Sequence, residues 1–271
     1  MLEAPIIQAG EEIPPGSIIT GFEYITPLPD EVCNRHIADS LKLGLPEAVE
    51  RRKLTIIAGG PSAAKVDLWS IDGPILALNS ALRLFTRRGL YPTYFAACDP
   101  QMEVADLIPD WVPENTTYLI ASKCHPKVFR KLKHRDVRVW HMRDYDAHDR
   151  SRIALCCSVT LTATWLMHRL GYTDFEYWGW DGCFMDGKHH AAVDDDWSKV
   201  ECLTVNWGGK IEGNEVVGGK TFDTTRTWVA EAKGAEQFFQ LAEYFDIILK
   251  INGGGMMEHA KRHVMEKPCV S

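Results

Sequence analysis

The sequence predicts an α/β protein of the Rossmann-like type, with a mainly parallel sheet, helices on both faces and a long loop insertion. Two observations predict this class. Short apolar runs alternate along the chain with helix-length segments, a pattern typical of a parallel sheet. Polar residues directly follow several of these runs, at the sheet edge where ligands bind in such folds. The expected strands are Leu54–Ala58, Ile75–Leu78, Tyr94–Cys98, Tyr118–Ala121, Val137–Trp140, Phe175–Trp178 and Ile247–Ile251.

The chain of 271 residues fits one large domain with additions. We expect an N-terminal extension over residues 1–50, a core over 51–252 with a loop insertion at 183–225, and a C-terminal tail over 253–271 that begins with a glycine hinge. The insertion lacks strong periodicity, and loops of that length are often functional. The expected helices are Asp30–Leu43 in the extension, Ser80–Arg88, Pro126–Leu132, Ser158–Leu170 and Thr227–Tyr244, and Glu201–Val205 is expected to form one arm of a hairpin.

Composition narrows the class of protein. Hydrophobic residues make up 45% and charged residues 25% of the chain, which is ordinary for a globular protein. No apolar run is long enough to cross a bilayer, and the N-terminus lacks the layout of a signal peptide. The eight cysteines include no Cys-x-x-Cys pair, so we expect reduced thiols and a cytoplasmic protein without a membrane partner. A formal charge of −7 argues against general nucleic-acid coating.

A glycine-rich turn follows the first expected strand, in the order Gly59, Gly60, Pro61 and Ser62. Glycines let a backbone approach a ligand closely, and the N-terminus of a following helix favours an anion. The Ser62 hydroxyl is a candidate for binding phosphate. The same pattern also fits a tight turn in which Ser62 only caps the helix.

Three more polar side chains follow expected strands. Asn79 comes after the second strand, Asp99 after the third and Asp181 after the sixth. Each side chain could cap the next helix, and an aspartate could equally bind a ribose hydroxyl or a metal. Because the carboxyl ends of parallel strands meet at one edge, these residues are expected to converge on one site. Two carboxylates near phosphates make Mg²⁺ a possible cofactor, although the sequence identifies no metal ligand set.

His189 and His190 lie in the long loop after Asp181. A histidine titrates near neutral pH, so either ring could stabilise a leaving phosphate or accept a proton from an acceptor hydroxyl. We therefore predict Asp181, His189 and His190 as catalytic residues. The alternative is a histidine pair at the surface without a role. The acidic run Asp194–Asp196 fits a solvated loop better than a metal motif.

Four stretches together resemble one superfamily of nucleotide-using enzymes. Its members include the motility-associated-factor (Maf) flagellin glycosyltransferases, the archaeal 6-hydroxymethylpterin diphosphokinases and the bacterial lipooligosaccharide sialyltransferases. The chain is also similar to proteins of tailed phages, so a phage-encoded member is expected. The resemblance covers roughly residues 50–252 and implies a Rossmann-like sheet that binds an activated nucleotide. The stretches are "TIIAGGPSAAKVDL", "ILALNSALRLFTRRGLYPTYFAACDP", "SVTLTATWLMHRLGYTDFEYWGWDGCFMDGKHHA" and "TWVAEAKGAEQFFQLAEYFDIILKI".

The resemblance implies roles for the residues after the first three strands. The turn Gly60–Ser62 matches the Gly-Pro-Ser that lies along the phosphate and sugar of the nucleotide in the sialyltransferases. Asn79 matches an asparagine that contacts the nucleotide. Asp99 stands where the sialyltransferases have asparagine, and an aspartate there is the pattern of the pterin and Maf branches.

Further roles follow from the second half of the resemblance. Ser158 and Thr160 lie in the segment that cradles the base, and Gly179–Asp181 matches a glycine-hydrophobic-aspartate at a strand end. His190 lies at or beside a tyrosine that holds the leaving phosphate. The sialyltransferases have a general-base histidine before the last helix, whereas this chain has Arg226 near that position and no histidine.

The sequence therefore predicts a nucleotide-dependent transferase, with a glycosyltransferase that uses a nucleotide-sugar donor as the first choice. One alternative is a diphosphokinase-type phosphotransferase that uses ATP and Mg²⁺, which Asp99 favours. The other is a non-catalytic nucleotide-binding phage protein. The expected partners are a nucleotide donor and an acceptor that could be a glycan, a protein or a modified DNA base.

Overall fold

The structure, a computed structural model, describes residues 46, 50, 52–142, 152–153, 158–192, 201–212 and 215–265. The helix expected over Asp30–Leu43 and the acidic run Asp194–Asp196 lie outside this part of the chain. Within it, no helix is long and apolar enough to span a membrane.

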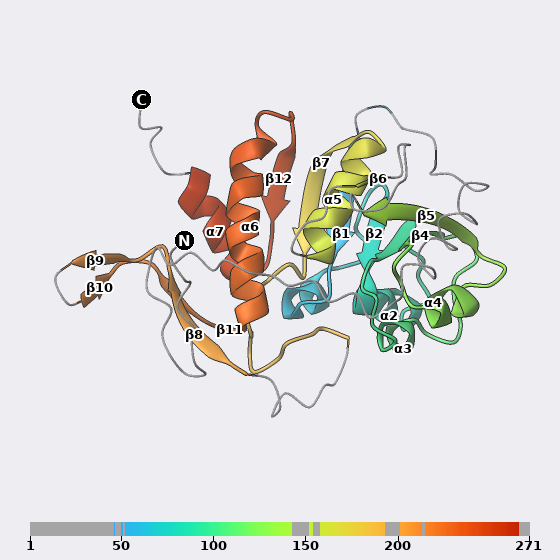
Figure 1. The fold of residues 1–271 in the computed structure, drawn as a ribbon, viewed down its shortest axis with the longest axis horizontal. Coiled ribbons are helices and arrows are strands. Elements are labelled where there is room, and N and C mark those ends of the chain that lie inside the picture. The colour runs from blue at the N-terminus through green and yellow to red at the C-terminus, as the bar shows by residue number, and fades with distance from the viewer. Residues whose placement is uncertain are drawn as a thin grey trace.

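The centre of the molecule is an eight-stranded sheet in the order β12-β7-β1-β2-β3-β4-β5-β6 (Figure 1). Every neighbouring pair is parallel. This confirms the predicted α/β, Rossmann-like class. All seven expected strands are present, and β6 is an additional strand too short to leave a periodic signal. The bounds are β1 Arg52–Ile57, β2 Ile75–Leu78, β3 Tyr94–Ala97, β4 Thr117–Ala121, β5 Asp136–Met142, β6 Arg152–Ile153, β7 Tyr172–Trp178 and β12 Ile248–Ile251.

The strand order changes direction at β1. From β1 the chain forms β2 to β6 on one side, and it then returns to form β7 on the other side, with β12 beyond it. After β1 the chain continues toward β2, and after β7 it continues in the opposite direction toward β12. Open parallel sheets bind ligands at the carboxyl ends of two neighbouring strands related in this way. Leu54, Ile56 and Ile57 of β1 are fully buried, as expected for a central strand covered on both faces.

The helices connect the strands, and side chains cap the two longest ones at their N-termini. Ser158 Oγ accepts the N–H of Leu161 at the start of α5, and Thr225 Oγ1 accepts the N–H of Trp228 at the start of α6. The helix expected over Ser80–Arg88 is divided into a 3₁₀ turn and a short α-helix. The bounds are η1 Pro61–Lys65, η2 Asn79–Ala81, α2 Leu82–Thr86, α3 Val104–Leu107, α4 Pro126–Lys131, α5 Val159–Arg169, α6 Arg226–Ala242 and α7 Met256–Met265.

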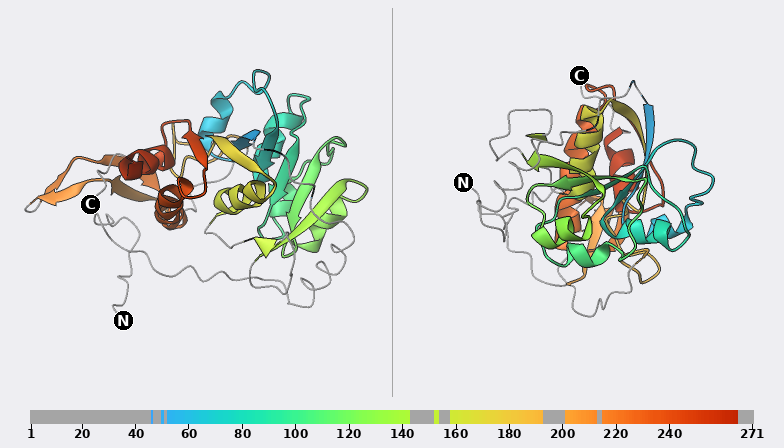
Figure 2. Two further views of the ribbon diagram at one scale, coloured as in Figure 1. Left: turned by 90° about the horizontal axis from the view of Figure 1, so that it is seen from above. Right: turned by 90° about the vertical axis from the view of Figure 1, so that its right-hand side faces the viewer.

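The insertion after β7 contains an antiparallel ribbon. Strand β8 (Leu203–Trp207) pairs with β11 (Lys220–Thr224), so the expected hairpin arm is present with its start shifted by two residues. The ribbon continues as β9 (Lys210–Glu212) and β10 (Glu215–Val217), which project from one end of the molecule (Figures 1 and 2). The chain then enters α6 at the carboxyl edge of the sheet.

The segment expected to be a glycine hinge and tail contains the helix α7 as far as Met265. Gly253–Gly255 packs against the turn after β7, and α7 follows at once beside α6 (Figure 1). Met256, Met257 and Ala260 are fully buried on one face of α7. Burial of this apolar face fixes the helix, although the local composition favours flexibility.

Candidate functional site

The turn after β1 is hydrogen-bonded to the turn after β7, where the strand order changes direction. The N–H of Gly60 donates to the carbonyl of Gly179 at 2.8 Å. The N–H of Gly179 donates to Ser62 Oγ at 2.8 Å, and the N–H of Ser62 donates to Asp181 Oδ2 at 2.8 Å. Ser62 and Asp181 are both buried. These three bonds fix the two turns relative to each other.

Glycine is required at position 60 because the two turns pack too closely there for a side chain. A Cβ at Gly60 would lie 2.6 Å from both Asp181 Oδ2 and the carbonyl oxygen of Gly179. Gly60 also precedes η1, which Pro61 begins, and the side chain of Ser62 caps no helix. The Ser62 hydroxyl faces Gly179 and not solvent. Contact of Gly60, Pro61 and Ser62 with a ligand, which the sequence suggests, stays a prediction.

Asp181 is held under the C-terminal glycines. Its Oδ1 atom is buried and has no hydrogen-bond partner within the described part of the chain. A Cβ on Gly253 would lie 2.8 Å from Oδ1, and one on Gly255 would lie 2.8 Å from Cα of Asp181. Burial raises the pKa of the Asp181 carboxyl, and its hydrogen bonds with Ser62 oppose this shift. Asp181 therefore holds the turn, and the catalytic role that the sequence suggests for it stays a prediction.

Asn79 carries local strain at the end of β2. Its φ of 46° lies in the left-handed region, which asparagine tolerates better than most residues. It caps no helix, in contrast to the alternative that the sequence left open. Its Oδ1 atom is buried and makes no hydrogen bond within the described residues. A strained residue with an unsatisfied acceptor is typical of a functional position.

The histidine pair returns to the turn after β1. The N–H of Ala191 donates to the carbonyl of Gly59 at 2.9 Å, which fixes the loop there. The Nδ1 atoms of His189 and His190 lie 2.9 Å apart. The His189 ring stacks on Trp228, with centroids 4.1 Å apart and an angle of 24°. Burial and the neighbouring His190 lower the pKa of His189 to about 3, so His189 is neutral at neutral pH.

Gly59 lies between two polar side chains. A Cβ at Gly59 would lie 2.7 Å from Ser80 Oγ and 3.0 Å from Cδ2 of His190. The absence of a side chain at Gly59 thus lets groups from η2 and from the insertion approach the same backbone. The sequence predicted both Gly59 and His190 as site residues, and the structure brings them together. Ser80 was not predicted, although it directly follows Asn79.

Asp99 lies farther along the same edge. It follows β3, and its Oδ1 atom accepts the N–H of Gln101 at 3.0 Å. Strands β1 and β2 stand between β3 and β7, so the strands that precede Asp99 and Asp181 are three strand spacings, or about 14 Å, apart. Among the described residues, no group of three or more His, Cys, Asp or Glu side chains is placed to hold a metal ion.

Ser158 and Thr160 begin α5 at this edge, but their environments differ. Ser158 is partly buried and caps the helix, whereas Thr160 is buried and its carbonyl accepts a hydrogen bond from Thr164 Oγ1 at 2.8 Å. The Ser158 side chain lowers the pKa of the Glu231 carboxyl, against the rise that burial causes. Contact of Ser158 and Thr160 with a base stays a prediction.

Glu231 is a site residue that the sequence reasoning missed. It is buried within α6, where its Oε1 atom accepts the indole N–H of Trp180 at 2.7 Å. Burial raises the pKa of its carboxyl. A signal was present in the sequence. Glu231 precedes Ala235 by four residues and Phe239 by eight, so an acid lies on the apolar face of the predicted helix.

Comparisons with known proteins support the fold. No protein-family model and no curated protein matches the chain. Among solved structures, it resembles the MAf glycosyltransferase from Magnetospirillum magneticum AMB-1 with a TM-score of 0.54 and 13% identity, over 87% of this chain and 41% of that one. A protein from Lactobacillus plantarum matches over 50% of both chains with a TM-score of 0.26 and 19% identity. The chain thus spans about two fifths of the MAf glycosyltransferase, and the likeness establishes a common Rossmann-like fold.

Proposed function

We propose that this protein is a nucleotide-dependent transferase, and that its donor is a nucleotide-sugar bound at the carboxyl ends of β1 and β2. One observation carries the proposal. The insertion is hydrogen-bonded to Gly59, and this contact gathers His190, Ser80 and Gly59 where the strand order changes direction. Gly59 leaves its backbone open to a ligand, and the Ser80 hydroxyl and the His190 imidazole lie beside it. Such groups are suited to bind the phosphates of a nucleotide.

In this proposal His190 is the general acid–base residue and His189 positions it. Two Nδ1 atoms 2.9 Å apart share one proton, so one of them donates and the other accepts. Since His189 is neutral, its Nδ1 can accept the Nδ1–H of His190 and orient the His190 ring, and Nε2 is then the atom of His190 that would take a proton from an acceptor hydroxyl. The stack on Trp228 holds His189 in the orientation that this hydrogen bond needs.

The likeness to a protein described as a glycosyltransferase supports sugar transfer over other transfers. The phosphotransferase alternative would place Mg²⁺ on Asp99 together with the phosphates of ATP. The hydrogen bond from Gln101 occupies only Oδ1 of Asp99 among the contacts described, so Oδ2 is the atom this alternative would use. A nucleotide-binding protein without activity is the remaining alternative.

Turnover of the donor tests the proposal without knowledge of the acceptor. The protein is incubated with CMP-, UDP- and GDP-sugars and with ATP, each with Mg²⁺ or with EDTA, and the released nucleotide is measured. We expect turnover of one nucleotide-sugar. His190→Ala should lower it by at least ~10²-fold and change nucleotide affinity much less, because a general acid or base acts on the chemical step.

The matched control is His134→Asn. His134 is exposed and has a φ of 71°, which asparagine tolerates, so this variant should keep wild-type turnover. Transfer from ATP that occurs only with Mg²⁺ would replace the proposal by the phosphotransferase alternative. Near-wild-type turnover in His190→Ala would remove His190 from the chemistry.

A further inference from the structure

Glu231 connects three elements that meet at the carboxyl edge of the sheet. Its carboxyl accepts the indole N–H of Trp180, which belongs to the turn after β7. Ser158, which caps α5, lowers the pKa of this carboxyl against the effect of burial. Glu231 itself belongs to α6. Burying an acid is costly, and an apolar residue of similar size often stabilises a fold as well or better. A buried acid at this position therefore points to a role beyond packing.

Trp180 links Glu231 to the candidate site through the backbone on either side of it. Its neighbours in the chain, Gly179 and Asp181, provide the groups that bond to Gly60 and Ser62. The Trp180 ring is buried between Tyr177 and Phe239, at centroid distances of 5.0 and 5.8 Å, so it moves little within its pocket of aromatic rings. A shift of the indole would thus move the backbone that holds the turn after β1.

We propose that Glu231 is a positioning residue for the nucleotide site, and that it acts by fixing Trp180 and Ser158 relative to each other. The inference rests on the proposed function, because its readout is nucleotide affinity. The site takes its shape from turns on β1, β7 and α5, and among the described residues Glu231 interacts with two of the three. Loss of these interactions should therefore weaken binding without any direct contact between Glu231 and the ligand.

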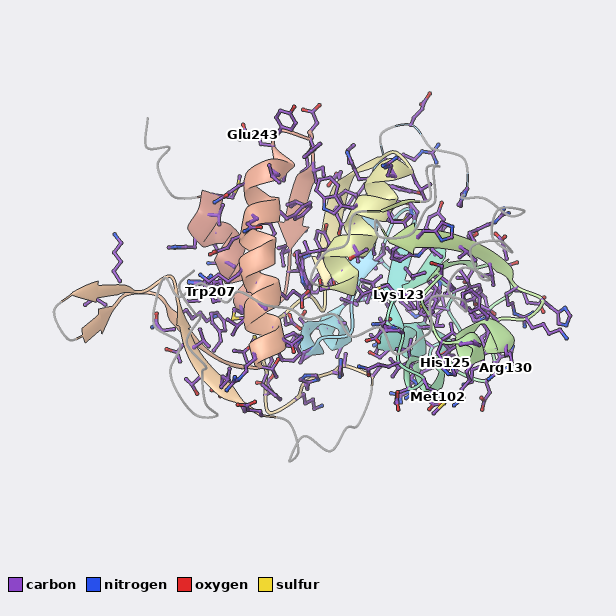
Figure 3. All side chains as sticks on the ribbon, viewed as in Figure 1. Met102, Lys123, His125, Arg130, Trp207 and Glu243 are labelled. Atoms are coloured by element: carbon purple, nitrogen blue, oxygen red, sulfur yellow. The ribbon has the colours of Figure 1, made fainter. Side chains whose placement is uncertain are left out.

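Helix α6 offers a matched control in a second indole–carboxylate pair. Trp207 donates its indole N–H to Glu236 Oε1 at 3.1 Å, and Lys233 lies over the Trp207 ring at 4.5 Å. In the view of Figure 3, Trp207 lies on the side of α6 away from β7. Glu231→Leu and Glu236→Leu thus remove the same kind of contact from one helix, but only the first contact reaches the candidate site.

The experiment measures the affinity of whichever of CMP, UDP, GDP, ADP and ATP binds the wild-type protein, by calorimetry on the full chain. Glu231→Leu should weaken affinity by about tenfold or more, as expected for loss of a hydrogen bond to an acidic group. Glu231→Gln keeps an acceptor for Trp180 and a polar group for Ser158, so affinity should stay within about threefold of wild type. Glu236→Leu should leave affinity unchanged.

Trp180→Phe keeps an aromatic ring and removes the indole N–H, so it tests the same contact if Glu231→Leu does not fold. It should weaken affinity, and the double variant with Glu231→Leu should lose less than the sum of the two single losses. Wild-type affinity in folded Glu231→Leu or in Trp180→Phe overturns the inference, and so does an equal loss in Glu236→Leu. A wild-type protein that binds none of the nucleotides overturns the proposed function as well, which separates the two failures.

Discussion

Gly59 and Gly60 are neighbours in the chain, but a side chain at each position would meet different atoms. At Gly59 a Cβ would approach the ends of two side chains, Ser80 and His190, and at Gly60 it would approach the backbone oxygen of Gly179. Side-chain ends can move by a rotation, whereas the backbone of a central turn cannot. The two glycines therefore have separable roles, one in the candidate site and one in the fold.

Alanine at each glycine tests this difference. We expect Gly60→Ala to lower the free energy of unfolding by about 1–3 kcal/mol, the range for overpacking, which corresponds to a fall in Tm of roughly 2–4 °C per kcal/mol. Gly59→Ala should change stability much less and weaken nucleotide affinity. Urea unfolding and calorimetry measure the two effects. Equal destabilisation by both variants would contradict the assignment of Gly60 to the fold and Gly59 to the candidate site.

The depressed pKa of His189 gives a second prediction at this scale. The pKa falls from 6.5 to about 3 on folding, so between these values the unfolded chain binds a proton that the folded chain does not. Stability therefore rises with pH across this window and is lost as the pH falls toward 3. His189→Gln cannot titrate and should flatten this slope, measured by urea unfolding at several pH values. A slope equal to that of wild type would show that His189 is not buried as described.

At the scale of elements, the C-terminal glycines cover the place where the strand order changes direction. Gly253 and Gly254 both have positive φ values, of 121° and 79°, so alanine is strained at either position. Only Gly253 is also crowded, since its Cβ would lie 2.5 Å from Ser62, whereas a Cβ at Gly254 would meet nothing within 4 Å. Gly253–Gly255 thus packs closely against Ser62 and Asp181.

This pair of glycines provides a prediction with an internal control. Gly253→Ala should destabilise the protein by at least ~1 kcal/mol more than Gly254→Ala. The positive φ strains alanine in both variants, but only the side chain in Gly253→Ala also collides with Ser62. The difference is measured by urea unfolding of the two variants. Equal losses in the two variants would mean that the glycine segment does not press on Ser62.

These elements show which parts of the fold and of the candidate site can be predicted from the sequence. Strands such as Leu54–Ala58 are predictable because both their faces are buried, which leaves an unbroken apolar run. The packing of Gly253–Gly255 is not predictable from local composition, since glycine favours flexibility locally and only the tertiary contact with Asp181 fixes it. The pairing of Ser62 with Asp181 is also long-range, because 119 residues separate them. Neighbouring strands thus predict which residues gather at the edge but not which of them bond to each other.

At the scale of the whole molecule, one topological feature organises the site. The chain forms five strands on one side of β1 before it returns to form β7 on the other side, and the insertion then folds back onto the turn after β1. Residues from the first strand, the second strand and the insertion thereby meet at one edge. The solved structure of the MAf glycosyltransferase shares this Rossmann-like fold.

The central claim is that a nucleotide binds where the strand order changes direction at β1, and thermal unfolding tests it most directly. The full chain is unfolded alone and with CMP, UDP, GDP, ADP or ATP, each with and without Mg²⁺. A ligand that binds only the folded state stabilises it by about 2.7 kcal/mol at a hundredfold excess over Kd, so at least one nucleotide should raise Tm by several degrees. The same nucleotide should raise Tm less in Gly59→Ala. An unchanged Tm with every nucleotide, at concentrations up to millimolar, would contradict the claim.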